Sequence, residues 1–208
     1  MTSIDPTALA IGFAVVLISL TIHEAAHAWT ADRLGDPTAR KLGRLSLNPI
    51  VHIDPIGTLL LPLIASISGL PLIGWAKPVP VTLRNLRHPR RDFMLVAVAG
   101  PISNLLQAVA LALVLRVLDA SGTGPALLYQ SLGLAIEVNL WLAFFNLIPV
   151  PPLDGGNVAL GLLPPRLAAQ YEQVRQFGFI ILYVLMFTGV ASAFIEPPTD
   201  LFMRILLP

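Results

Sequence analysis

Four long apolar segments constrain the fold of this chain more than any other feature of its sequence. A helix crosses the hydrocarbon core of a membrane with about 20 predominantly apolar residues. That length is reached by Thr7 to Ala31, Phe93 to Leu115, Ala126 to Val150 and Gln176 to Ile195, and the second and fourth carry no charge. A shorter tail, Leu201 to Leu207, suits the membrane interface. The sequence therefore predicts an all-α polytopic membrane protein with about four transmembrane helices.

The composition agrees with a chain that uses the lipid bilayer as its solvent. It is 55% hydrophobic and only 12% charged, against roughly 25% charged in soluble domains. The net charge of +1 gives no argument for nucleic acid as a partner. There is no cysteine, so a metal site has to use His, Asp and Glu. The N-terminus lacks the basic region and cleavage pattern of a signal peptide, so we expect the first apolar segment to be retained.

A fifth apolar stretch, Ile56 to Ala76, is interrupted by three glycines and two prolines. Basic residues concentrate on the cytoplasmic side of membrane proteins, and both flanks of this stretch are basic. A re-entrant segment keeps both flanks in the cytoplasm, whereas a fifth span would place one outside. We therefore expect a re-entrant segment, an external connection at Asp119 to Pro125, and a site that faces the cytoplasm. The flanking residues are Arg33, Arg40, Lys41 and Arg44 before it, and Lys77, Arg84, Arg87, Arg90 and Arg91 after it.

The stretch Gly74 to Leu83 alternates weakly and contains two prolines. Proline removes a ladder hydrogen bond and is confined to the edges of sheets. This stretch therefore predicts a short membrane-associated edge strand.

His23, Glu24 and His27 form an H-E-x-x-H sequence within the first apolar segment. Residues four apart share one face of a helix, so both imidazoles can bind one zinc ion while Glu24 accepts a proton from the water that the metal activates. Three ionisable groups inside a membrane span are costly, which argues against a chance match. A third ligand is needed, and Asp154 is the best candidate, although Pro-x-Asp-Gly also occurs as a plain helix-ending turn.

Three motifs together resemble the site-2 protease family of intramembrane zinc proteases, peptidase family M50. They are HEAAHA in the first span, AGPISN (Ala99 to Asn104) and FNLIPVPPLDGG (Phe145 to Gly156). The stretches Ala28 to Pro62 and GWAKPVPV are similar to the compact subgroup without PDZ domains. The resemblance implies that Asp154 is a zinc ligand, that Asn146 lines the site and that GWAKPVPV pairs with an unwound substrate.

The expected domain is single, 1–208, with a core at 7–163 and an accessory C-terminal helix at 176–195. In the expected reaction Glu24 is the general base, and Asn146, or failing that Asn104, stabilises the oxyanion. Either asparagine can instead form an interhelical hydrogen bond. Asn139 and Glu137 lie too far along their helix to reach the metal, and we expect Glu137 to be buried in a polar contact. The roles of His52 and Asp54 stay open.

The expected partners are a transmembrane protein substrate and the lipid bilayer of the cytoplasmic membrane, with a regulatory partner or a homo-oligomer left open. A small transporter is the main alternative, but it predicts ionisable residues spread over several spans. A metal-binding scaffold without activity has no need of Glu24 beside its ligands.

Overall fold

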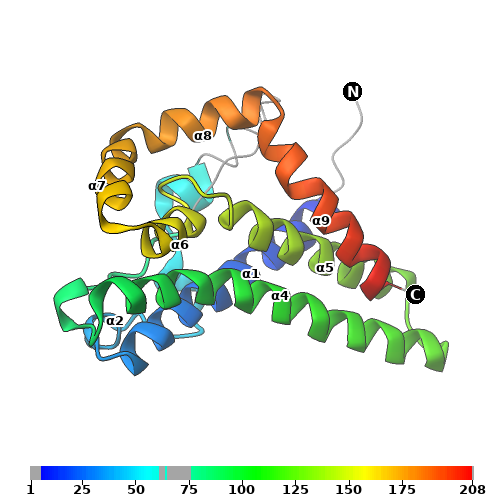
Figure 1. Ribbon diagram of the computed structural model, residues 1–208. Helices are drawn as coiled ribbons and strands as arrows, with labels where there is room; N and C mark the ends of the chain where they lie inside the picture. The colour runs from blue at the N-terminus through cyan, green and yellow to red at the C-terminus, as the bar shows by residue number, and fades with distance from the viewer. Residues whose placement is uncertain (1–5, 61–63, 65–75, 208) are drawn as a thin grey trace.

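The computed structural model describes residues 6–60, 64 and 76–207, and this part of the chain is helical, with no strand (Figure 1). Most of the stretch at 56–76 lies outside the described residues, so the re-entrant segment stays a prediction. Its first residues form a π-helical turn, Pro55–Leu60. The expectation of an all-α protein is confirmed for the described residues.

Three helices are long and apolar enough to cross a membrane, namely α1 (Pro6–Arg33), α4 (Pro89–Ser121) and α5 (Ala126–Asn146). They correspond to the first three apolar segments of the sequence. Proline stands at the first position of α4, where its missing N–H costs nothing. Gly122 ends the same helix in the left-handed conformation, with φ of 64°. The three helices pack against one another and form the core of the molecule (Figure 1).

Small side chains let α4 and α5 approach closely. Ala108 and Ala112 of α4 are buried together with Ile136 and Leu140 of α5. Association of helices within a membrane relies on such close packing, because lipid is as apolar as the side chains themselves.

The fourth expected span is broken. It comprises α8 (Gly178–Phe187) and α9 (Val190–Leu206). The helical segment Pro165–Phe187, which ends with α8, is bent by 69° relative to α9. The break occurs at Gly189, whose φ of 77° is left-handed and is readily adopted only by glycine. The described residues thus contain three candidate spans, or four if the bent pair counts as one.

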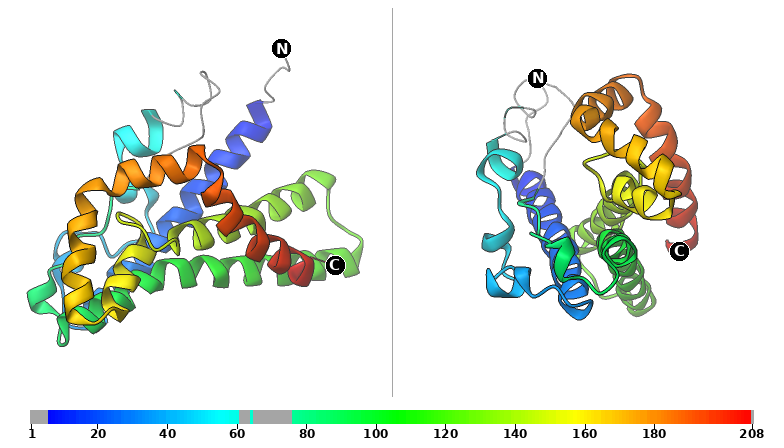
Figure 2. Two further views of the ribbon diagram at one scale, coloured as in Figure 1. Left: turned by 45° about the horizontal axis from the view of Figure 1, so that its top comes forward. Right: turned by 60° about the vertical axis from the view of Figure 1, so that its left-hand side comes forward.

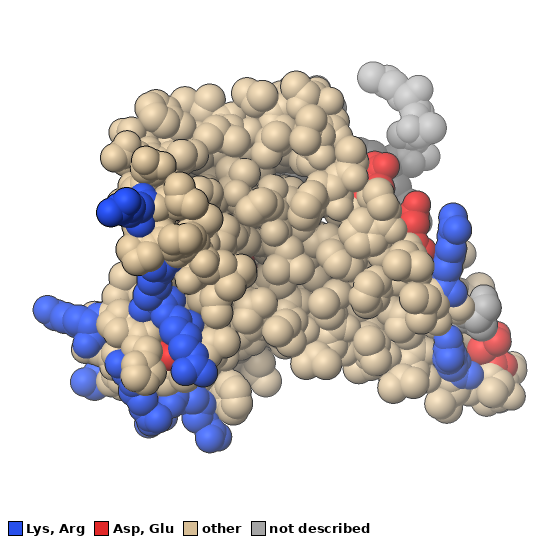
Figure 3. Space-filling model, viewed as in Figure 1, with Lys and Arg blue, Asp and Glu red and all other residues tan. Residues whose placement is uncertain are grey.

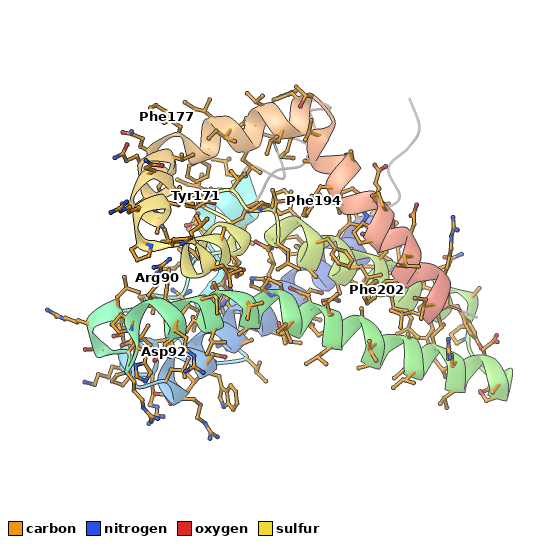
Figure 4. All side chains as sticks on the ribbon, in the orientation of Figure 1. Arg90, Asp92, Tyr171, Phe177, Phe194 and Phe202 are labelled. Carbon is orange, nitrogen blue, oxygen red and sulfur yellow. The ribbon has the colours of Figure 1, made fainter. Side chains whose placement is uncertain are left out.

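The C-terminal tail forms the last turns of α9. Phe202 of α9, labelled in Figure 4, packs against Phe144 of α5, and their ring centroids are 5.5 Å apart. Arg116 of α4 donates hydrogen bonds to the carbonyls of Ile205 and Leu206, which have no partner within the helix. α9 and α1 lie on opposite sides of the α4–α5 pair (Figure 2).

Two shorter helices complete the fold. α6 (Asp154–Leu162) packs against α4, and α7 (Pro165–Val174) follows it and leads into α8. Lys and Arg side chains gather at the end of the molecule where α2 (Thr38–Lys41) and the start of α4 lie (Figure 3). This is the charge distribution on which the cytoplasmic orientation was predicted.

Candidate metal centre

α1 presents two histidines and a glutamate to the interior at one depth. His23 is 3% exposed, His27 is 8% exposed and Glu24 is 9% exposed. The two imidazole rings are one helical turn apart and lie edge to face, with centroids 4.7 Å apart. The four-residue spacing therefore brings them together as the sequence predicted.

Asp154 meets these histidines from a distant part of the chain. It is the first residue of α6, which packs against α4. Its Oδ2 atom lies 3.1 Å from Nε2 of His23 and 3.3 Å from Nε2 of His27. Ligand atoms around a tetrahedral zinc ion, with bonds of about 2.0–2.1 Å, are about 3.3 Å apart. Both separations from Asp154 match that value, and the three ligand atoms all lie within 4.8 Å of one another, so the donor set can hold a zinc ion.

The Nδ1 atoms of both histidines are engaged by α4. Nδ1 of His27 donates to the carbonyl oxygen of Val96 over 2.7 Å. Nδ1 of His23 lies 2.5 Å from Oδ1 of Asn104. A histidine that donates through one ring nitrogen keeps the lone pair of the other for a metal. Both Nε2 atoms, which face Asp154, are therefore the ones available as ligands.

Gly100 of α4 leaves room for this arrangement. A Cβ atom at this position would lie within 3.0 Å of Nε2 of both His23 and His27, closer than real Cβ atoms approach other groups. Next to it stands Pro101, which is buried inside the helix and has no N–H for the carbonyl of Ala97. The Gly-Pro pair thus lets α4 pass close to the two candidate ligands, His23 and His27.

Comparison with other proteins decides the family of this chain. Residues 124–189 match the model of peptidase family M50. YwhC of Bacillus subtilis, named as a candidate zinc metalloprotease, is 41% identical over 187 residues, which cover 88% of this chain and 82% of YwhC. The chain belongs to peptidase family M50. The expectation of a zinc metalloprotease of the site-2 protease type is confirmed by this membership.

More distant relatives agree with the assignment. Rip2 of Mycobacterium tuberculosis, also named as a candidate zinc metalloprotease, is 32% identical over 188 residues, 88% of this chain and 70% of Rip2. A zinc metalloprotease of Methanocaldococcus jannaschii is 28% identical over 157 residues, 76% of this chain and 35% of its own length. No solved structure is similar to this protease at a significant level.

The carboxylate of Glu24 is held by the backbone of residues 76–82. Its Oε2 atom accepts a hydrogen bond of 3.0 Å from the amide of Val79. The same segment is anchored by the amide of Lys77, which donates to the carbonyl of His52 over 2.9 Å, and by a hydrogen bond from Arg44 to the carbonyl of Lys77. Residues 76–82 form no strand with the rest of the described chain, because several of their backbone groups are bonded to side chains and loops instead.

Asp36 fixes the far end of this segment. It is fully buried, and its carboxylate accepts hydrogen bonds from the amide of Thr82 over 2.6 Å, from the amide and hydroxyl of Thr38, and from Nδ2 of Asn85. Burial by itself raises the pKa of the Asp36 carboxyl, but these hydrogen bonds outweigh it and hold the pKa below its ordinary value. Asp36 therefore ties the loop after α1 to the segment that contacts Glu24.

The two asparagines of the site occupy different environments. Asn104 is completely buried and bonded to other polar side chains. Asn146, the last residue of α5, is partly exposed, and its Nδ2 donates to the carbonyl of Leu142 over 2.9 Å. Their expected roles toward an oxyanion stay predictions.

Three other residues from the sequence analysis are also placed. Glu137 is exposed on α5, so its expected burial is wrong, because α1, α4 and α9 contact other faces of that helix. His52 is buried and its Nε2 atom bonds to the carbonyl of Ser46. Asp54 accepts hydrogen bonds from the amides of Ile56 and Gly57 and so begins the π-helical turn.

Proposed function

We propose that this M50 protease is an intramembrane endopeptidase that hydrolyses peptide bonds in transmembrane or membrane-associated proteins. The observation that carries the proposal is the meeting of His23, His27 and Asp154 between apolar helices, with Glu24 on the next residue of the same helix. When bound by these three ligands, zinc supplies a Lewis acid that makes water acidic enough to lose a proton near neutral pH.

Glu24 supplies the base in this proposal. It accepts the proton of the attacking water and later delivers it to the leaving amine. The amide of Val79 donates to Oε2 of Glu24, which stabilises the ionised carboxylate and leaves Oε1 as the oxygen for the proton. Asn146 is the proposed donor to the oxyanion, since its amide lies at the helix end that leads to Asp154. To act, Nδ2 of Asn146 exchanges its bond to the carbonyl of Leu142 for the substrate oxygen.

The segment at 76–82 is the proposed binding strand for the substrate. A transmembrane helix has to unwind before its backbone can be attacked, and pairing with an extended segment satisfies the backbone groups that unwinding frees. The hydrogen bond from the Val79 amide to Glu24 supports this role, because Glu24 is the proposed base. The proposed site faces the cytoplasm, because Lys and Arg side chains gather at one end of the molecule (Figure 3) and basic residues concentrate on the cytoplasmic side of membrane proteins.

The decisive experiment compares the wild-type protease with Glu24→Gln, both loaded with zinc. Gln keeps the shape of the side chain but cannot take a proton, so zinc content should be unchanged and cleavage should be lost. The readout is new N-termini in the membrane proteome of cells that make either protein, with fluorescent casein in detergent as a defined probe. Turnover equal to the wild type would overturn the role of Glu24, and new N-termini confined to water-soluble proteins would overturn the intramembrane assignment.

A further inference from the structure

A chain of buried amides connects three helices to one metal ligand. Oδ1 of Asn104 (α4) faces Nδ1 of His23 (α1) at 2.5 Å, and Nδ2 of Asn104 donates to Oδ1 of Asn139 (α5) over 2.8 Å. Nδ2 of Asn139 in turn donates to the hydroxyl of Ser19 over 3.0 Å and to the carbonyl of Ala135 over 2.8 Å. Asn104 is 0% exposed and Asn139 is 1% exposed, so water does not substitute for these partners.

The carbonyl of Ala135 determines the direction of every hydrogen bond in this series of side chains. The carbonyl of Ala135 can only accept, so the side chain of Asn139 has to turn its NH2 group toward it. That leaves Oδ1 of Asn139 as an acceptor, and Asn104 has to donate to it. The carbonyl of Ser19 lies 3.5 Å from Nδ2 of Asn104 and favours the same orientation, since it too can only accept.

This direction decides the tautomer of His23. Because Asn104 directs its NH2 group at Asn139, its oxygen is the atom that faces His23. Nδ1 of His23 then has to carry the proton, and Nε2, which lies 3.1 Å from Oδ2 of Asp154, would keep its lone pair for a metal ion shared with that carboxylate. A neutral histidine with the opposite tautomer would set two acceptors against each other in a buried, low-dielectric site, which is costly.

We propose that Asn139 is a positioning residue that selects the metal-binding tautomer of His23 through Asn104. The distance of Asn139 from Asp154 along the chain excludes it as a metal ligand. It acts instead through Asn104, to which it is hydrogen-bonded. The inference rests on the metal site proposed above, and it assigns the relay Asn139–Asn104–His23 to metal affinity rather than to the chemistry of cleavage. His27 needs no such relay, because a backbone carbonyl, that of Val96, accepts directly from it.

Two variants of nearly equal volume test this role. Asn139→Val removes both the donor and the acceptor, whereas Asn139→Thr keeps a hydroxyl that can donate to the carbonyl of Ala135, four residues earlier, and accept from Asn104. Zinc affinity is measured on the purified full-length protease in detergent by competition with a chelator. Loss of a partner that orients a ligand typically weakens metal binding by about 10–100-fold, and we expect Asn139→Val to fall in that range and Asn139→Thr to lie closer to the wild type.

Leu140→Val is the control for general destabilisation, because Leu140 is a neighbouring, fully buried residue of α5 outside the relay. It should lower thermal stability without changing the zinc affinity. A second readout is the 15N NMR spectrum of the zinc-loaded protease labelled on histidine, in which we expect the Nδ1 proton of His23 to be hydrogen-bonded and slow to exchange in the wild type and to lose that protection in Asn139→Val.

The inference is overturned if Asn139→Val binds zinc as tightly as the wild type, or if Val and Thr weaken binding equally while the exchange protection of the His23 Nδ1 proton is unchanged. Either result leaves the proposed protease function standing. A wild-type protein that binds no zinc at all would overturn both.

Discussion

The amide of Val79 donates a hydrogen bond to Oε2 of Glu24 over 3.0 Å, across 55 residues of sequence. Val79 lies between Pro78 and Pro80, neither of which has an N–H group. Its amide is therefore the only backbone donor of these three residues. This relationship joins the segment that we propose to bind substrate to the residue that we propose to take the proton.

Val79→Pro should slow cleavage while leaving zinc content unchanged. The substitution removes the donor to Glu24, and a hydrogen bond to a charged group contributes about 1.5–3 kcal/mol, equivalent to about 10–100-fold in rate. The measurement is kcat together with zinc content by atomic absorption. Val79→Ala keeps the amide and is the matched control, so a rate for Val79→Pro no lower than that of Val79→Ala would show that the contact does not contribute.

Asp154→Ala should release the metal. The substitution leaves two histidines as ligands where a catalytic zinc normally has three, so zinc content after dialysis should fall well below one per chain. Asp119→Ala is a suitable comparison, because Asp119 lies in the last turn of α4, far along that helix from Gly100. Full zinc occupancy in Asp154→Ala would contradict the ligand role.

Gly100→Ala should lower zinc affinity although it adds a single methyl group. The new Cβ would lie within 3.0 Å of Nε2 of both His23 and His27, so the ligands or α4 have to move. In a helix that faces only other helices or lipid, Gly→Ala would instead be neutral or slightly stabilising. Gly133→Ala on α5 is the control, since a Cβ there meets nothing within 4 Å. Equal affinities for the two variants would show that the site tolerates the methyl group.

Asp36→Asn should destabilise the protease near neutral pH by about 1–3 kcal/mol, because one of the donors that face the carboxylate would meet an NH2 group. The lowered pKa gives this contribution a definite pH dependence. The ionised carboxyl stabilises the fold fully above its unfolded pKa, near 3.8, and the contribution is lost as the pH falls through the lower folded value. Thermal unfolding followed from pH 7 to pH 3 should show the variant and the wild type converging at the acid end. A constant difference over this range would contradict the assignment.

Much of the site follows from local rules that a sequence displays directly. The spacing of His23 and His27 needs only one regular helix to bring them together, and a long apolar segment in a membrane has to be helical because its backbone groups have no other partners. Asp154 could be identified through its motif. The three packed spans were predicted for the same reason, close to the bounds of α1, α4 and α5.

The remaining features depend on contacts between distant segments. No local sequence pattern predicts that Asn139 is linked to His23 through Asn104, that Val79 contacts Glu24, or that Gly100 lies beside both histidines. Each contact depends on how α1, α4 and α5 are rotated about their axes. The exposure of Glu137 and the 69° bend between the segment Pro165–Phe187 and α9 have the same origin. The sequence by itself determined the three long helices α1, α4 and α5, the candidate metal ligands and the family. The tertiary structure alone decided which faces of those helices meet, because packing rather than helical periodicity selects the neighbours of each side chain.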